Sequence, residues 1–241
     1  MVKKNWLLVV LIGVLILIVG TGLLAKFGME RAAAEEISAK FPDRGVPRMN
    51  ITLNGVTLEE INAGSKDVKY EGNEVAVYEG EEKTLEAENV RVKGRGNGTW
   101  LQEKKPYQIK FDKKVDLFGL GKAKKWALLA NAMDATNLRT AIAFDLEEML
   151  DMNPRFDGEF VELYVDGEYV GLYYLTHVVE IGKSTVDLKD PMGVLVELDN
   201  VYGDLERNYS TKNGELLVVK DFVDVENMPM AMERFVERFN E

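Results

Sequence analysis

Cysteine is absent from this sequence of 241 residues. Its absence excludes disulfide bonds and thiolate metal sites, and it fits a bacterial extracytoplasmic protein as well as many others. Histidine occurs once, as His177, and a lone histidine is more often a packing or surface residue than a catalyst or metal ligand. Repeats and low-complexity tracts are also lacking. The apolar fraction of 46% excludes global disorder, so we expect one soluble domain of about 200 residues with an appendage.

Positive charge is scarce in most of the chain and is concentrated in one stretch. The formal net charge is −11, yet residues 91–125, here called the basic segment, hold eleven Lys or Arg and only three acidic side chains. The acidic remainder repels nucleic acid, whose binding depends on phosphate neutralisation, so we expect no nucleic-acid partner. Lysines beside glycines are what a phosphate-bearing ligand requires, because glycine lets backbone N–H groups approach the anion. A solvated face of charged strands and turns is the alternative interpretation.

Charge is missing altogether from residues 6–25, an apolar run of twenty residues. That length spans a hydrocarbon core of about 30 Å. Lys3 and Lys4 precede it and favour a cytoplasmic N-terminus. We therefore expect a cytoplasmic stub (1–5), a transmembrane signal anchor (6–25), a stalk (26–45) and a domain (46–241), which places the domain on the extracytoplasmic side of the cell membrane. A cleaved signal peptide is the alternative, although its apolar region is usually shorter.

The sequence pattern of the domain predicts many short antiparallel strands. Apolar alternation or short apolar runs predict strands, which are at 49–56, 69–78, 84–93, 107–111, 126–130, 160–165, 168–175, 194–198 and 216–219. Asp166-Gly167 is a tight hairpin signal between two of them. In the strand 107–111, alternation sets Tyr107, Ile109 and Phe111 on one face and Lys110 on the other.

One central helix is predicted over 137–149. Leu138, Ile142, Leu146 and Met149 recur at helical spacing and predict its apolar face, and Asp134 or Thr136 can cap its start. A final helix is predicted over 226–240, and the apolar face of its residues 230–240 needs a partner or a continuation of the chain. Many antiparallel strands with one central helix make the expected fold class α+β.

Four blocks in order carry a family resemblance. They are GRGNGTW, KKPYQIKFDKK, KKWALLANAMDATNLRTAIAFDL and FVELYVDGEYVGLYYLTHVVE. Together they resemble the CotH family of spore-coat protein kinases, from about residue 91 to 200. Several blocks at matching spacing are far more specific than one glycine motif. The resemblance implies an atypical, secreted or surface-exposed kinase that uses ATP and Mg²⁺.

A kinase-like nucleotide-binding lobe would follow from the resemblance, with a phosphate-binding lysine, a glycine turn and an acid on the helix. Lys110 is the lysine, and Arg95, Gly96 and Gly98 form the turn that cradles phosphate or is simply tight. Asp145 on the helix is the candidate partner of Lys110. Thr176 follows the hairpin where the chain would pass the adenine. Each of these residues also has an ordinary structural interpretation.

The family's catalytic blocks, which resemble N-x-D and W-D-F-D, are not found after residue 200. His177 is a further departure, because the family usually carries an acid near it. Glu197, Asp199 and Asn200 lie in another family-like block and could bind a metal or the phosphoacceptor, or could be plain polar residues. The chain is then a fragment or a natural short form without kinase activity.

Two functions therefore stay open. The first is a membrane-anchored CotH-like kinase that binds ATP and phosphorylates Ser or Thr of extracytoplasmic or spore-coat proteins. The second is a catalytically inactive surface interaction or coat-assembly module with a kinase-like lobe. A carbohydrate-binding β-domain is a weaker third, because Trp100 and Trp126 suggest no clear aromatic platform.

Overall fold

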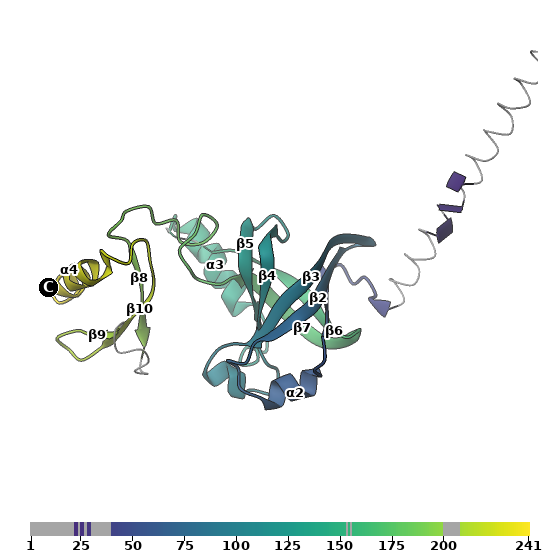
Figure 1. Ribbon diagram of the computed structural model, residues 1–241, viewed down its shortest axis with the longest axis horizontal. Coiled ribbons are helices and arrows are strands. Elements are labelled where there is room, and N and C mark those ends of the chain that lie inside the picture. The colour runs from purple at the N-terminus through teal and green to yellow at the C-terminus, as the bar shows by residue number, and fades with distance from the viewer. Residues whose placement is uncertain are drawn as a thin grey trace, which may run out of the picture.

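The computed structural model describes residues 22, 23, 25, 26, 28, 29, 40–152, 154, 156–199 and 208–241. Its largest part is a closed β-barrel in the order β1-β2-β3-β4-β5-β7-β6 (Figure 1). The strands are β1 (Arg48–Thr52), β2 (Tyr70–Glu79), β3 (Glu82–Gly94), β4 (Tyr107–Asp116), β5 (Lys122–Leu129), β6 (Gly158–Val165) and β7 (Glu168–His177). Neighbouring strands are antiparallel except β1 and β6, which run parallel.

The barrel closes where β1 meets β6. Arg48 lies opposite Glu162, and Ile51 lies opposite Val165. The β6–β7 hairpin turns at Asp166 and Gly167, whose φ values of 51° and 85° are those of a tight turn with two left-handed residues. The hairpin predicted there is confirmed. Closure leaves the barrel without an unpaired edge strand.

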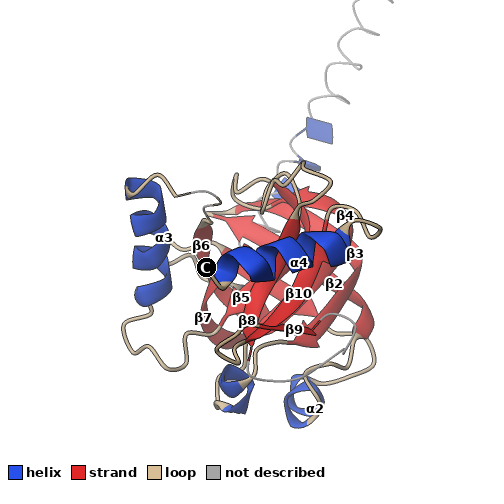
Figure 2. Ribbon diagram, turned by 90° about the vertical axis from the view of Figure 1, so that its left-hand side faces the viewer, coloured by secondary structure: helices blue, strands red, loops and turns tan. Residues whose placement is uncertain are grey.

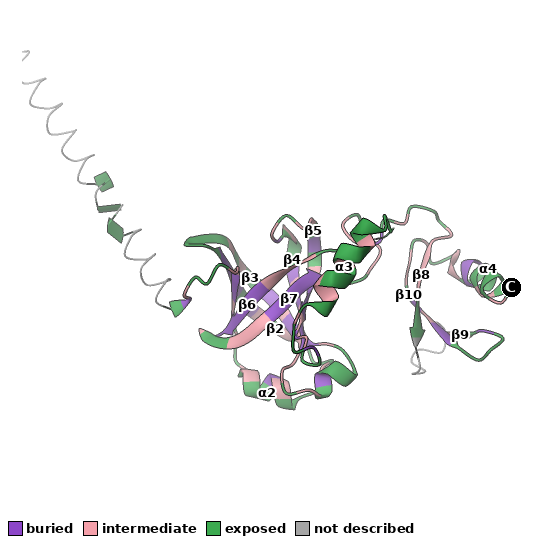
Figure 3. Ribbon diagram, turned by 180° about the vertical axis from the view of Figure 1, so that it is seen from behind, coloured by how far each residue is buried: buried purple, intermediate pink, exposed green. Residues whose placement is uncertain are grey.

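Apolar residues from alternate positions fill the barrel. In β4, Tyr107, Ile109 and Phe111 are buried, whereas Gln108 and Lys110 are not, as predicted. Large, fully buried side chains occupy the centre, and among them are Met49, Ile51, Ile109, Trp126, Leu128, Leu163 and Leu175. Figure 3 shows this burial along the barrel strands. Because inward and outward positions alternate, the outer wall is free to carry charged side chains.

Two helices accompany the barrel. The short α2 (Leu58–Ala63) begins with a capping box between Thr57 and Glu60. The helix α3 (Arg139–Met149) stands beside the barrel wall (Figure 2). Its contact with the wall runs through Phe144, whose ring lies 5.9 Å from that of Tyr174 on β7. Helix α3 therefore lies outside the barrel.

A smaller sheet follows the barrel and has its own core. It has the order β8-β10-β9, with β8 (Val194–Asp199), β9 (Asn208–Ser210) and β10 (Leu216–Phe222). Helix α4 (Met228–Phe239) packs on it through the fully buried Met232, which meets Leu217 and Val219. The final helix predicted from the sequence is confirmed, and part of its apolar face is covered by this sheet.

The predicted fold class is wrong. A kinase-like α+β lobe built around one central helix was expected, but the sheet closes into a seven-stranded barrel and α3 lies outside it. The reason is the β1–β6 pairing, which joins distant segments that local patterns cannot connect. The transmembrane helix predicted over 6–25 falls almost wholly outside the described residues. None of the helices that the structure does describe is long and apolar enough to cross a membrane.

Candidate functional site at the barrel mouth

Two connections meet at one end of the barrel. One joins β3 to β4 through residues 95–106, and the other joins β5 to α3 through residues 130–138. They lie together because Gly94, the last residue of β3, pairs with Tyr107, and Tyr107 pairs in turn with Leu128 near the end of β5. The barrel wall thus fixes both connections, and functional side chains on such loops are held by a rigid scaffold.

The larger hollow at this end, here called the mouth cavity, has a volume of about 610 Å³. Its lining includes Asn62 from α2, Lys104 and Lys105 from the first connection, Asn131 from the second, and Tyr173 from β7. A volume of this size lies within the roughly 300–1,000 Å³ range of small-molecule sites. The mouth cavity is therefore large enough for a nucleotide-sized ligand.

A second hollow, the Arg95 cavity, borders the same segment and has a volume of about 350 Å³. Arg95, Gly96 and Arg139 line it. Both cavities are lined by Ala130, Asn131, Ala132 and Asp134. The two hollows are therefore neighbours that share one wall.

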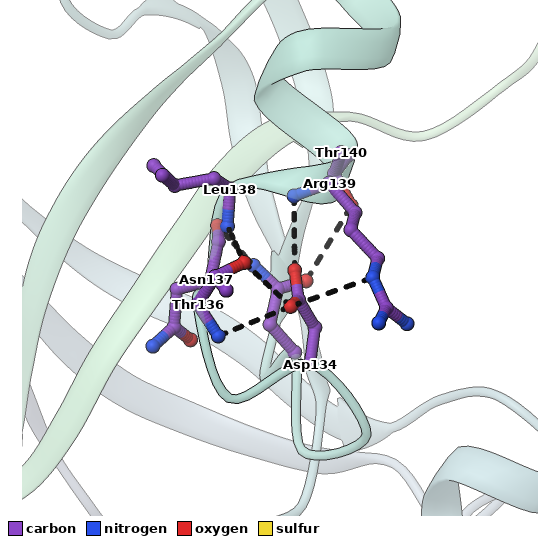
Figure 4. A network of polar contacts seen from close by, with 7 residues as sticks. Asp134, Thr136, Asn137, Leu138, Arg139 and Thr140 are labelled. Atoms are coloured by element: carbon purple, nitrogen blue, oxygen red, sulfur yellow. Dashed lines mark hydrogen bonds and ion pairs between the residues drawn. The ribbon is translucent and has the colours of Figure 1, made fainter.

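Asp134 organises this shared wall (Figure 4). Its Oδ2 accepts the backbone N–H of Arg139 at 2.9 Å, and its Oδ1 accepts the Thr136 hydroxyl at 2.6 Å and the Thr136 N–H at 3.1 Å. The Thr136 hydroxyl oxygen in turn accepts the Leu138 N–H at 3.2 Å. These bonds, the Thr136 hydroxyl first among them, hold the pKa of Asp134 below its ordinary value of 3.8. Of the two predicted caps, Asp134 accepts the first N–H of α3, whereas Thr136 accepts that of Leu138, the residue before the helix.

The glycine turn that begins the first connection is tightly packed. Gly96 has φ +79°, and a Cβ there would collide with the Thr99 hydroxyl. Gly94 is also required, since a Cβ would lie 2.6 Å from the Trp100 ring. Gly98 has no atom within 4 Å of its hypothetical Cβ, so space alone does not require glycine there. The glycine at 96 is thus explained by a contact within the turn itself.

Three cations surround the shared wall without an acidic partner among the described residues. Lys104 donates to the Leu172 carbonyl and lies 4.6 Å from the Tyr173 ring. Lys105 donates to the Trp100 carbonyl at 2.7 Å and lies 5.2 Å from the Trp100 ring. Arg95 is partly buried, and burial lowers the pKa of both Arg95 and Lys104. Partly buried charges without a counter-charge are costly, so this site favours an anionic ligand.

Two tyrosines form the apolar side of the mouth. The Tyr107 hydroxyl donates to Asn62 Oδ1 at 2.7 Å, and the Tyr173 hydroxyl donates to the Lys105 carbonyl at 2.9 Å. Burial raises the pKa of Tyr107 to about 12 and raises that of Tyr173 further. Both hydroxyls are therefore neutral at physiological pH, and they brace the lysine-bearing connection.

The predicted site residues do not all come together. Arg95 and Gly96 line the Arg95 cavity, while Gly98 begins a short 3-10 helix, Gly98–Leu101, and is exposed. Lys110 lines a separate pocket on the outside of β4. Asp145 lies exposed on α3 and forms no ion pair with Lys110 in the described chain. Thr176 is buried on β7, where its hydroxyl donates to the Asp157 carbonyl at 2.6 Å.

His177 is a packing residue. It is buried, and its ring lies 4.3 Å from that of Trp126. Its Nε2 lies 3.3 Å from the Gly121 carbonyl, and burial lowers its pKa below 6.5. In β8, Glu197 is paired with Lys220. Asn200 lies outside the described residues.

A Mg²⁺ site does not fit the residues that the structure describes. Within the described ranges, no three His, Asp or Glu side chains group so as to hold a metal. Two carboxylates border the mouth cavity, those of Glu103 and Asp134, and the Asp134 oxygens already accept three hydrogen bonds from Thr136 and Arg139. Protein-held Mg²⁺ needs carboxylate oxygens free for it, and the mouth cavity does not supply a set of them.

Lys104 and Lys105 were missed as site residues. The sequence signal was their place before Pro106 in the block KKPYQIKF, with Trp100 and Tyr107 on either side. Alternation within the strand favours Lys110 as the phosphate-binding lysine, because only strand residues can be assigned a face from a period of two. Lys104 and Lys105 precede the strand and are positioned by aromatic rings instead.

A comparison with family models agrees with the motifs. The model described as CotH kinase protein matches residues 90–229, which is more than half of the chain and includes both connections at the mouth. A search of curated proteins finds no match.

Proposed function

The chain belongs to the CotH kinase protein family, and from this membership we propose that the barrel mouth binds ATP. The triphosphate would lie along the shared wall, near Lys104, Lys105 and Arg95. The observation that carries the proposal is that these three cations have no carboxylate partner in the described residues. Lysine and arginine side chains around phosphates are the ordinary means of neutralising them.

The residues of the mouth then have separate tasks. Lys104 and Lys105 neutralise phosphate oxygens, and the Tyr173 ring and the Trp100 carbonyl keep them in place. Asp134 fixes the backbone of the wall through Arg139 and Thr136. ATP would supply the transferable phosphoryl group. The acceptor we propose is a Ser or Thr hydroxyl of a spore-coat or other extracytoplasmic protein.

The binding proposal is tested by calorimetry with ATP on the full 241-residue chain. We expect the double variant Lys104→Ala/Lys105→Ala to weaken binding at least 10-fold. The matched control Lys69→Ala/Lys113→Ala removes two exposed lysines that line neither the mouth cavity nor the Arg95 cavity. It should change affinity less than twofold. Equal losses in both variants, or no heat with millimolar ATP, would reject the mouth as the nucleotide site. Lys110→Ala tests the sequence-based alternative in the same titration.

A non-enzymatic coat-assembly role is the second candidate. It is favoured by the lack of a grouped carboxylate set in the described ranges, because phosphoryl transfer depends on metal ions held by acidic residues. Incubation with radiolabelled ATP and a serine-rich peptide separates the two. Label in the peptide supports the kinase, whereas ATP binding without any transfer supports assembly.

A further inference from the structure

A second group of lysines lies apart from the mouth, on the β4–β5 hairpin. It lines a pocket of about 280 Å³, here called the hairpin pocket, against the loop that follows β7. The lysines are Lys110, Lys114, Lys122, Lys124, Lys125 and Lys183. The hairpin pocket shares no lining residue with the mouth cavity or the Arg95 cavity. The basic segment thus supplies lysines to two separate places.

The hairpin pocket has far more positive than negative charge. Glu180 is its one acidic lining residue, and it pairs with Lys125. The other five lysines have no carboxylate partner among the described residues. Lys110 lies directly opposite Lys125 on the neighbouring strand, and like charges in that position repel each other. An anion that enters the pocket would relieve this repulsion.

The loop that forms the other wall is braced. The Thr185 hydroxyl donates to the Glu180 carbonyl at 2.5 Å, and the Gly182 N–H donates to the Val186 carbonyl at 3.0 Å. The Ile181 N–H donates to Asp221 Oδ2 at 2.9 Å, which ties the loop to β10. The pocket therefore exists before any ligand arrives, and little ordering is needed to fill it.

The side chains that line the hairpin pocket indicate a phosphate-bearing ligand. All its cations are lysines, which bind phosphate oxygens as point charges. The volume of about 280 Å³ lies just below the usual range of about 300–1,000 Å³ for small-molecule sites. It therefore suits a few phosphate groups better than a whole nucleotide.

We propose that the hairpin pocket is a second anion site that binds closely spaced phosphate groups. It is independent of the nucleotide proposed for the mouth and does not need that nucleotide to bind. Binding should weaken as salt rises, because screening acts on lysines near the surface.

The test is calorimetry with inorganic tripolyphosphate on the full chain. Lys110→Gln/Lys122→Gln should weaken binding at least 10-fold. The control Lys69→Gln/Lys113→Gln removes the same charge from exposed positions outside the pocket and should change affinity less than twofold. Thermal melts of all proteins establish that each variant is folded. The proposal is overturned by equal losses in both double variants, or by the absence of binding at millimolar tripolyphosphate.

Two further arms separate this site from the mouth and identify its source of phosphate. The variant Lys104→Ala/Lys105→Ala weakens any binding at the mouth, and its affinity for tripolyphosphate at the hairpin pocket should stay within about twofold of that in the parent protein. If that variant loses tripolyphosphate binding as well, the ligand sits at the mouth and the hairpin pocket is rejected. A peptide with two adjacent phosphoserines replaces tripolyphosphate in the last arm. Tighter binding of the peptide than of tripolyphosphate assigns the pocket to phosphorylated proteins, and weaker binding assigns it to condensed phosphate.

Discussion

Asp134 holds the first backbone N–H of α3, that of Arg139, at 2.9 Å from a position five residues earlier in the chain. Leu138, the residue just before the helix, offers no side-chain cap. The carboxylate of Asp134, which lines both the mouth cavity and the Arg95 cavity, therefore also caps the first N–H of α3. Helix start and cavity wall are thus coupled through one side chain.

Replacement of Asp134 by Ala should fray the start of α3 and lower the Tm by roughly 2–4 °C, as expected for the loss of a helix cap in a chain of this size. The folded pKa of Asp134 lies below 3.8, so its contribution is present above that pH and is lost as the pH falls through the folded value. Thermal melts from pH 7 to pH 2 measure both effects. A variant whose Tm matches that of the parent protein at pH 7 would contradict this account.

Gly96→Ala should destabilise the protein by about 1–3 kcal/mol, because an alanine there combines a positive φ with a collision against Thr99. Gly98→Ala is the matched control, and it should change stability by no more than about 0.5 kcal/mol, since its Cβ meets nothing. Urea denaturation of both variants provides the comparison. Similar losses for the two would show that the turn is not as tight as described.

His177 offers a clean titration because it is the only histidine in the sequence. Burial against Trp126 lowers its pKa below 6.5, so more than half of the rings should be neutral at pH 6.5. A folded pKa below the unfolded value means that its contribution to stability is present above pH 6.5 and lost as the pH falls through the folded pKa. NMR of the imidazole protons measures the midpoint. A midpoint at or above 6.5 would show that the ring is solvated.

Tyr107 should link stability to alkaline pH. Burial raises its pKa from 10.0 to about 12. The folded value lies above the unfolded one, so the stabilising contribution is complete below pH 10 and lost as the pH rises through about 12. Tyr107→Phe should flatten the decline between these values. Urea midpoints across that pH range decide the matter.

Phe144→Ala should release α3 from the barrel wall. The ring contacts Tyr174 at 5.9 Å and Phe156 at 6.2 Å, and such aromatic pairs contribute about 0.5–1.5 kcal/mol beyond their buried area. Ile142→Ala, on the same helix but 51% exposed, should cost less than about 0.5 kcal/mol. Circular dichroism melts distinguish the two. A larger loss from Ile142→Ala would restore the helix face predicted from the sequence.

The α3 helix shows where periodicity succeeds and where it fails. Spacing of Leu138, Ile142 and Leu146 located the helix correctly, because helix period and caps are local properties. The same residues are 48%, 51% and 48% exposed, and Phe144 makes the contact instead. Which face is buried depends on the neighbouring wall, and the sequence alone does not place that wall.

The sequence predicts the cationic chemistry of the site but not the separation of its cations into two places. Composition located the basic segment, and alternation set Lys110 on the outer face of β4, as observed. The separation of Lys110 from Arg95 and Gly96 follows from the distance along β3 and β4, since Arg91, not Arg95, lies opposite Lys110. Strand register of this kind is set by turns and packing, and no local pattern in the sequence indicates it.

The seam between β1 and β6 has a consequence for how the chain acquires its shape. Arg48 on β1 lies opposite Glu162 on β6, more than a hundred residues later in the chain. The barrel can therefore close only after β6 has formed. Contacts so distant in sequence slow folding, because a long loop must close before they form. During synthesis β1 will leave the ribosome early and stay half-paired, with β2 on one side and bare backbone groups on the other. Until β6 arrives, that open flank is the part of the barrel most exposed to aggregation.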